Sequence, residues 1–486
     1  MKSVKIISIL IALIYTALFM FSEPSPYSRQ LCAFSLLVCI GLIYLFVLTS
    51  KYSGIENKLI KPSNIFMTAL VVICFQTIAD YVLGIRDISG SLYPNTINKC
   101  AFIGVVSIAS FNAGYAHLAK KYSATKFCPK FTSVVRPNFF ALAAIQLISF
   151  LMFVFGFGFS NLISGASYLG GNEAATGTIG TYGEILLYAT NVAIVVLSSS
   201  QKRNASFVVY LNSFPMSTKY VFVLYILIRM LSGDRGPVIY NGLLLLYGYL
   251  YSSSRKLNIV KVSILALVAV TVINVIGIAR TFDNTMSIGD KFTIAMTLYQ
   301  KGGRFAMDDV YEGTCFPPTI ELAGSSRVTE IAINNIECQH DIYTYGLMHF
   351  VQLMNSIPFS SHLYRMIPMR PEYFSSSARA NYCFFGGYES TWGIGTNMIA
   401  DFYWDFGILG VLILFFVVGL AFYKVDNVLL GSERYTFNPY WIGFALIYAA
   451  ESVYIPRSTF FSLIRTVAYC AVLIYFFGGV KKTINT

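Results

Sequence analysis

The sequence has little charge and lacks the short motifs of common soluble enzymes. Only 12% of its 486 residues are Asp, Glu, Lys or Arg, whereas 56% are hydrophobic. Soluble proteins carry about twice that charged fraction, so the composition excludes a soluble multidomain enzyme. The sequence has no CxxC pair, no His-x-x-x-His spacing, no GxSxG and no GxxxxGK[ST]. We therefore expect no metal site and no cofactor.

Apolar stretches long enough to cross a bilayer recur along the chain. A crossing helix needs roughly 20 mainly apolar residues, and short polar segments separate about twelve such stretches. The sequence thus predicts an all-α polytopic membrane protein. The expected spans are residues 4–21, 31–49, 64–84, 101–118, 138–157, 184–199, 219–231, 237–253, 258–279, 400–422, 439–454 and 460–478.

Lys and Arg residues concentrate in alternate short loops. Cytoplasmic loops of membrane proteins are enriched in these residues, so both termini are expected in the cytoplasm. The opposite short loops carry only Arg29, Arg86, Lys99, Arg235 and Arg457. The formal net charge of +12 reflects this bias. No basic run is interleaved with stacking aromatic residues, so no nucleic-acid partner is expected.

One exterior connection, residues 280–399, is far longer than the others. A structureless loop of this length is uncommon, so this large loop should fold into a cap of short helices, near residues 292–299 and 345–356. The chain then divides into membrane helices in residues 1–279, the large loop, and further membrane helices with a cytoplasmic C-terminus in residues 400–486.

Two shorter features carry further expectations. The glycine-rich segment of residues 157–183 is predicted to be a mobile loop. In the large loop, an oxidising compartment permits a disulfide between Cys315 and Cys338, and free thiols fit the sequence equally well.

Three arginines are expected at the exterior membrane boundary. Arg235 follows Asp234 in a glycine-flanked turn, Arg229 lies in the preceding helix, and Arg280 ends the ninth span. Charges at such depth are unfavourable unless they serve a cavity, and a guanidinium matches phosphate oxygens in geometry. Taken singly, each arginine also fits contact with a lipid headgroup, and Arg235 also fits an ion pair with Asp234. Together they favour a diphosphate site.

Two acids lie at the start of the tenth span. Asp401 and Asp405 are four residues apart and share one helical face, along with Asn397 if the helix begins early. Acids on an apolar helix must face protein or water rather than lipid. Capping and orienting the helix is the alternative role. His349, in the large loop, is a further candidate for acid–base chemistry.

These segments resemble those of the Wzy-type O-antigen polymerases. The resemblance extends over the chain in topology and is carried by three motifs. The motifs are Gly233-Asp234-Arg235-Gly236, the large loop with Tyr345-Gly346 and Ile357-Pro358, and the segment from Gly395 through Asp401 and Asp405 to Gly410.

The resemblance implies an inner-membrane glycosyltransferase of the metal-independent GT-C type. Such an enzyme moves a growing glycan from undecaprenyl diphosphate onto the next lipid-linked repeat unit, on the periplasmic side. The implied partners are the undecaprenyl-diphosphate-linked oligosaccharide donor and acceptor, membrane lipids and a chain-length regulator.

The resemblance also assigns roles to residues. Arginines would stabilise the leaving diphosphate; Arg235 matches the turn arginine of the family, and Arg280 is assigned by position. The acceptor hydroxyl needs a general base, a role that stays open among His349, Glu389 and Asp401. Further candidates for contact with the substrate are Arg229, Asp234, Asp405 and Tyr345.

Two other functions fit part of the pattern. An O-antigen ligase or another lipid-linked glycan transferase would share the arginines but use a different acceptor. A transporter or flippase of lipid-linked oligosaccharide would explain the many spans. It has little need for a folded cap of this size, and its charges should line the midplane rather than one boundary.

Overall fold

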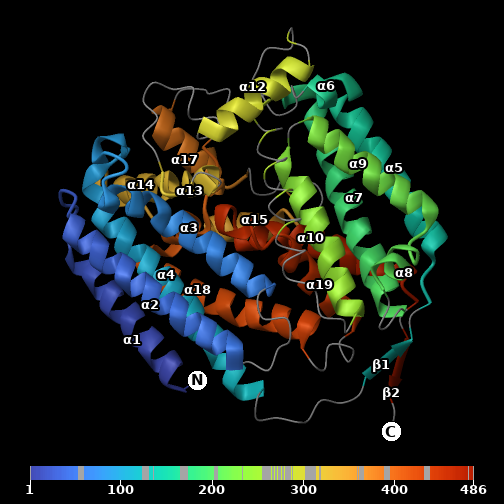
Figure 1. The fold of residues 1–486 in the computed structure, drawn as a ribbon, viewed down its shortest axis with the longest axis horizontal. Helices are drawn as coiled ribbons and strands as arrows, with labels where there is room; N and C mark the ends of the chain where they lie inside the picture. The colour runs from blue at the N-terminus through green and yellow to red at the C-terminus, as the bar shows by residue number, and fades with distance from the viewer. Residues whose placement is uncertain are drawn as a thin grey trace. The chain divides into compact units, whose positions relative to one another are not determined.

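A computed structural model shows how the chain folds (Figure 1). It describes residues 2–52, 60–122, 131–134, 136–164, 173–201, 206–232, 234–253, 264, 268, 271, 275, 278–279, 286, 288–301, 314–316, 319–357, 360, 366–387, 394–431, 438–479 and 481–484. The chain forms two compact units. The first comprises Met1–Cys128, Glu312–Asn427 and Ser452–Arg465, and the second comprises Pro129–Tyr311, Val428–Glu451 and Thr466–Thr486.

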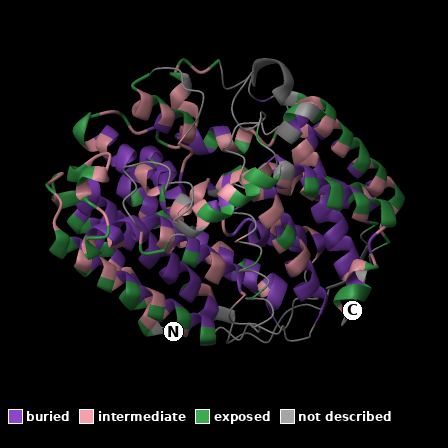
Figure 2. Cartoon of the chain, turned by 45° about the horizontal axis from the view of Figure 1, so that its top comes forward, coloured by how far each residue is buried: buried purple, intermediate pink, exposed green. Residues whose placement is uncertain are grey.

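Seven of the described helices are long and apolar enough to cross a membrane. They confirm the expectation of an α-helical, multi-pass membrane protein. Buried and exposed residues alternate around many of the helices (Figure 2). The seven are α1 (Lys2–Phe21), α2 (Arg29–Tyr52), α3 (Pro62–Leu83), α4 (Ile97–Tyr122), α5 (Phe139–Phe157), α7 (Glu173–Gln201) and α18 (Met398–Leu430).

Other expected spans coincide with shorter or less apolar helices. These are α9 (Met216–Leu231), α10 (Arg235–Ser252), α19 (Pro439–Ala450) and α20 (Ile464–Phe477). The expected span at 258–279 lies outside the described residues, apart from a few isolated positions. One small sheet departs from the all-α expectation: β1 (Phe131–Val134) pairs antiparallel with β2 (Lys481–Ile484), with Phe131 opposite Ile484.

In the first unit, α4 packs against α1, α2 and α3. It also approaches α18 closely, because a Cβ on Gly114 would lie 2.0 Å from the Phe416 carbonyl oxygen and one on Gly419 would lie 2.2 Å from the Phe111 carbonyl oxygen. Small residues of this kind let membrane helices pack backbone to backbone. The close contact fixes α18, which carries the two acids of interest.

A buried polar cluster joins four helices of this unit at one end. The Asp426 carboxylate of α18 accepts hydrogen bonds from the Ser63 amide at 3.2 Å and the Tyr115 hydroxyl at 2.8 Å. Lys61 donates to the Ser50 carbonyl oxygen at 2.8 Å. Because buried polar groups are costly unless paired, the cluster holds the ends of α2, α3, α4 and α18 in one arrangement.

The part of the large loop in this unit is a layer of short helices, as expected. Its described elements are the α-helices α13 (Ile320–Ala323), α14 (Ser326–Ile333), α15 (Leu347–Met354) and α17 (Ser376–Phe385), the π-helix η5 (Asn334–Cys338) and the 3₁₀-helix η6 (Pro371–Phe374). Polar contacts anchor the layer to the long helices. Lys99 of α4 forms an ion pair with Glu337 at 2.9 Å, and Asp80 of α3 accepts from the Cys315 amide at 2.7 Å.

In the second unit, the prediction of a mobile loop over residues 157–183 is wrong for its described parts. They form α6 (Phe159–Ser164) and the first turns of α7. The glycines serve helix packing: a Cβ on Gly156 of α5 would lie 2.2 Å from the Gly180 nitrogen of α7, and one on Gly183 would lie 2.6 Å from the Phe153 nitrogen.

The remaining part of the large loop contributes α12 (Ile288–Lys301) to the second unit. This confirms the helix expected near residues 292–299. Ala295 of α12 packs with Val275 and Ile278. Short helix α8 (Phe207–Leu211) precedes α9. The described cysteines are all free thiols, and both Cys315 and Cys338 are exposed.

Candidate functional site

The three polar residues His349, Asp401 and Asp405 meet in the first unit. α15 begins after Gly346, whose φ of 93° is available to glycine at little cost. The Asp405 carboxylate then accepts hydrogen bonds from the first-turn amides of Met348 at 3.3 Å and His349 at 3.0 Å. Asp405 thus caps the N-terminus of α15 from another helix. A negative charge at a helix N-terminus is stabilising.

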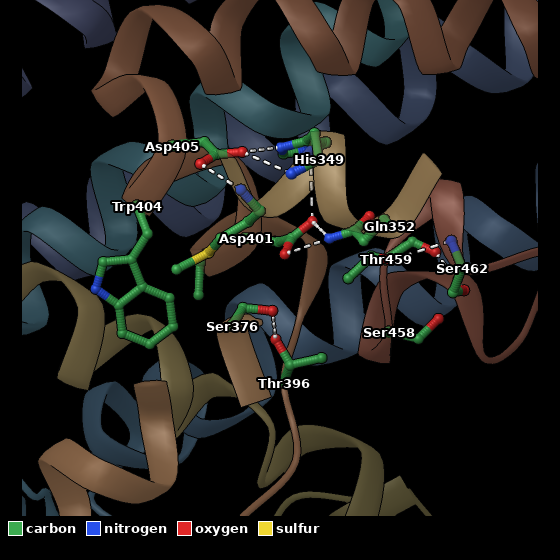
Figure 3. A network of polar contacts seen from close by, with 12 residues as sticks. His349, Gln352, Ser376, Thr396, Asp401, Trp404, Asp405, Ser458, Thr459 and Ser462 are labelled. Atoms are coloured by element: carbon green, nitrogen blue, oxygen red, sulfur yellow. Dashed lines mark hydrogen bonds and ion pairs between the residues drawn. The ribbon is translucent and has the colours of Figure 1, made fainter. Parts of the chain in front are cut away.

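The His349 ring lies between the two acids (Figure 3). Its Nδ1 forms a hydrogen bond with Asp405, and its Nε2 lies 3.4 Å from an Asp401 carboxylate oxygen. The ring stacks on Phe402 with centroids 5.3 Å apart and meets the edge of Phe461 at 5.4 Å. Aromatic packing and the Asp405 contact together fix the orientation of the imidazole.

Asp401 is fully buried and also contacts Gln352. The Gln352 amide nitrogen of α15 donates to both Asp401 carboxylate oxygens at 3.0 Å (Figure 3). As expected from their spacing, Asp401 and Asp405 share one face of α18, just before a break at Gly407, where φ is 64°. Asn397 does not join them: it donates to the Ser325 carbonyl oxygen at 2.6 Å.

The cluster is suited to moving a proton. Burial of the His349 ring acts to lower its pKa, but the hydrogen bond to Asp405 and the charges of Asp401 and Asp405 outweigh burial and raise the pKa above its usual 6.5. An imidazole held by a carboxylate on one nitrogen can accept a proton on the other. Asp405 then orients the ring, as the third member of such an arrangement does.

A second buried network supports the chain that leads to α15. Arg379 of α17 is 1% exposed and donates to Asp341 at 3.0 Å and to the Ile342 carbonyl oxygen at 2.8 Å. Its guanidinium also donates to Asn335, which accepts a hydrogen bond from the Trp404 indole of α18 at 3.1 Å. The segment that ends at Tyr345 is therefore fixed to the helix that carries the acids.

Arg229 has a different setting from the one expected, in the second unit. It forms ion pairs with Glu184 of α7 and, at 3.4 Å, with Asp234. Its guanidinium also lies over the Phe153 ring, 4.7 Å from the centroid. Tyr225 donates to Glu184 at 2.6 Å. Arg229 is thus held by two carboxylates, an arrangement suited to fixing a turn.

Asp234 and Arg235 begin α10. The Asp234 side chain caps the helix by accepting a hydrogen bond from the Gly236 amide at 3.2 Å. Arg235 is the first helical residue and is half-buried. The other two expected site residues, Arg280 and Glu389, lie outside the described residues.

Sequence reasoning missed Gln352, Glu184 and Arg379. Nothing in the sequence marks Gln352, because its role depends on the packing of α15 against α18. Glu184 and Arg379 are charged residues whose partners, Arg229 and Asp341, are distant in the sequence. Among the described residues, no group of three or more His, Cys, Asp or Glu could hold a metal ion.

The long apolar helices and the buried acid–imidazole cluster define a multi-pass membrane protein with a candidate proton-transfer site. The family model for the O-antigen polysaccharide polymerase Wzy matches residues 4–482, nearly the whole chain. The protein therefore belongs to this family, which implies a glycosyltransferase-type polymerase acting on lipid-linked oligosaccharides. No curated protein and no solved structure shows significant similarity to the chain.

Proposed function

We propose that the protein polymerises undecaprenyl-diphosphate-linked oligosaccharide repeat units into O-antigen or a related surface polysaccharide. It acts in the bacterial inner membrane as a metal-independent GT-C glycosyltransferase with about twelve spans. The reaction takes place on the periplasmic side, and both termini are cytoplasmic. Family membership supports the polymerase role, and the distribution of Lys and Arg supports the orientation.

The observation that carries the chemistry is the His349 ring held between Asp401 and Asp405. A hydroxyl of the acceptor repeat unit attacks the anomeric carbon of the donor glycan. The bond from that carbon to the diphosphate oxygen breaks, and undecaprenyl diphosphate leaves. The hydroxyl proton passes to His349 Nε2, beside Asp401. Asp405 positions the imidazole through Nδ1.

Arginines stabilise the charge that develops on the diphosphate. Arg235 and Arg280 supply bidentate hydrogen bonds, which a guanidinium offers to phosphate in a fixed geometry. Arg229 acts indirectly, because its pairing with Glu184 and Asp234 holds the turn that presents Arg235. A chain-length regulator is the proposed protein partner. Glu389 remains a further candidate base.

Gene replacement in cells that produce the protein tests this function. Without the gene, lipopolysaccharide should carry a single repeat unit, and the wild-type gene should restore the ladder of longer chains. His349→Gln should fail to restore it. His340→Gln is the matched control, because His340 is an exposed histidine of the same loop. Loss of all glycan from the lipid A core would instead indicate a ligase or flippase, and an unchanged ladder would exclude a polymerase.

A further inference from the structure

Tyr345 combines an exposed aromatic ring with an unfavourable backbone. Tyr345 is 79% exposed, and its φ of 47° lies in the left-handed region that bulky residues avoid. An exposed side chain recovers little of that cost through packing. Strained residues of this kind persist where the surrounding structure imposes them, and they cluster at ligand-binding sites.

The neighbours of Tyr345 impose its conformation. The Thr344 amide donates to the Trp404 carbonyl oxygen at 2.9 Å, and the Thr344 hydroxyl donates to Asp405. On the other side, a Cβ on Gly346 would lie 3.0 Å from the Phe406 ring. Tyr345 therefore lies between Thr344, which is hydrogen-bonded to α18, and Gly346, which lies close to the Phe406 ring of α18.

A second tyrosine supports the ring of the first. Tyr343 meets Tyr345 edge to face, with centroids 6.3 Å apart at 70°. Tyr343 in turn meets Tyr403 of α18 at 6.0 Å and 83°. The exposed ring of Tyr345 is thus part of a rigid aromatic row, which loses little conformational freedom when a ligand binds.

The same contacts tie Tyr345 to the candidate proton acceptor. Thr344 and His349 share the carboxylate of Asp405, and the Phe406 ring against Gly346 also lies 5.8 Å from the His349 ring. A ligand on Tyr345 is therefore held in a fixed relation to His349.

We propose that Tyr345 is a stacking platform for a sugar ring of the acceptor repeat unit, an inference that rests on the proposed function. One face of a pyranose carries C–H groups that pack on an aromatic ring, while the hydroxyls at its rim stay free to react. Stacking on Tyr345 directs an acceptor hydroxyl toward His349. Tyrosines that only anchor a protein at the lipid interface need no strained backbone, so the sugar is the favoured occupant.

A direct binding assay tests the platform. The ligand is the free oligosaccharide that mild acid releases from the lipid-linked repeat units of cells that lack the protein. With purified protein in detergent, Tyr345→Ala should weaken binding about 3- to 10-fold, the effect of losing one aromatic contact. Tyr345→Phe should bind within about 2-fold of wild type. Tyr382→Ala is the matched control, because Tyr382 is a 44% exposed tyrosine on α17, and it should bind as wild type does.

Tyr345→Gly separates a binding role from a structural one. Glycine accepts a positive φ, so this variant should show an equal or higher melting temperature together with weakened binding. A lower melting temperature would assign the ring a structural role and overturn the proposal. So would wild-type affinity in Tyr345→Ala, equal weakening in Tyr382→Ala, or no binding by the wild-type protein.

The outcomes distinguish this inference from the polymerase proposal. If the wild-type protein binds the oligosaccharide through Tyr345 but forms no polymer, the polymerase proposal fails and the platform stands. If the protein forms polymer and Tyr345→Ala keeps both its affinity and its KM for the acceptor, the platform alone fails.

Discussion

Asp405 offers the sharpest test of the acid–imidazole cluster. This fully buried carboxylate accepts hydrogen bonds from the Thr344 hydroxyl, the amides of Met348 and His349, and His349 Nδ1. Removing one partner of a buried ionic pair costs about 3–5 kcal/mol. Asp405→Ala should therefore destabilise the protein by about 3–5 kcal/mol, measured by thermal denaturation in detergent.

Asp405→Asn separates the chemistry from the fold. With the amide oxygen in the place of Asp405 Oδ1, the hydrogen bonds from the Thr344 hydroxyl and the Met348 amide remain, so the protein should remain folded. The amide nitrogen is a donor, however, and facing His349 Nδ1 it forces the imidazole proton onto Nε2. Nε2 then cannot accept a proton, and polymer formation should fall by about 10²- to 10⁴-fold.

The control for this prediction is Thr344→Val, which removes one hydroxyl donor to Asp405 but keeps the contact between Asp405 and His349. It should cost about 1.5–3 kcal/mol and should lose much less activity than Asp405→Asn. Initial rates of polymer formation, measured with purified protein and lipid-linked repeat units, give the comparison. Wild-type rates in Asp405→Asn would refute the role of Asp405 in orienting His349.

Four further expectations concern other parts of the molecule. Arg235→Lys should lose most activity, because an ammonium does not reproduce a bidentate phosphate contact; wild-type activity in both Arg235→Lys and Arg235→Ala would remove the diphosphate role. Glu184→Gln should lower stability by about 1–3 kcal/mol, because Arg229 keeps Asp234 as a partner, with partial recovery in Glu184→Asp, whereas an unchanged melting temperature would mean that the ion pair with Arg229 contributes nothing. The raised pKa of His349 means that the stability from its charged form is full below about 6.5 and is lost as pH rises through the higher folded value. The stability advantage of wild type over His349→Gln should therefore shrink with rising pH, while activity, which needs the neutral imidazole, should increase; the opposite trends would exclude this assignment. With Cys315 replaced by serine, exposed Cys338 should react with an impermeant maleimide in intact spheroplasts. Cys338→Ser in the same background is the control, and labelling only after lysis would reverse the predicted orientation.

Local patterns in the sequence predicted a large part of the fold. Long apolar runs identified the membrane helices, because length and composition alone decide whether a segment can span a bilayer. Helical periodicity likewise placed Asp401 and Asp405 on one face of α18. The helix expected over residues 345–356 appears as α15, two residues shorter at each end.

The glycine-rich segment shows where local patterns fail. Glycine occurs both in loops and where helices pack closely, and the sequence around Gly180 and Gly183 does not distinguish the two. The structure shows close packing, since a Cβ at Gly180 would lie 2.6 Å from the Phe157 ring of α5. Only knowledge of the neighbouring helix could have corrected the prediction.

The sequence also could not predict which residues pair with the buried charged side chains. His349 and Asp405 are 56 residues apart, and Arg229 and Glu184 lie on different helices. Hydropathy identifies the helices but not which helices pack together. The sequence therefore made Arg229 a candidate diphosphate ligand without showing that two carboxylates already pair with it. The proposed roles of Arg229, which holds the turn, and of Arg235, which binds the diphosphate, depend on this pairing.

The most direct test of the account uses purified protein in proteoliposomes with radiolabelled lipid-linked repeat units and no other protein. Wild-type protein and His340→Gln should form a ladder that lengthens with time by whole repeat units, while His349→Gln, equally folded, should leave single units. A ladder of wild-type length from His349→Gln would contradict the claim that the acid–imidazole cluster of α15 and α18 drives polymerisation.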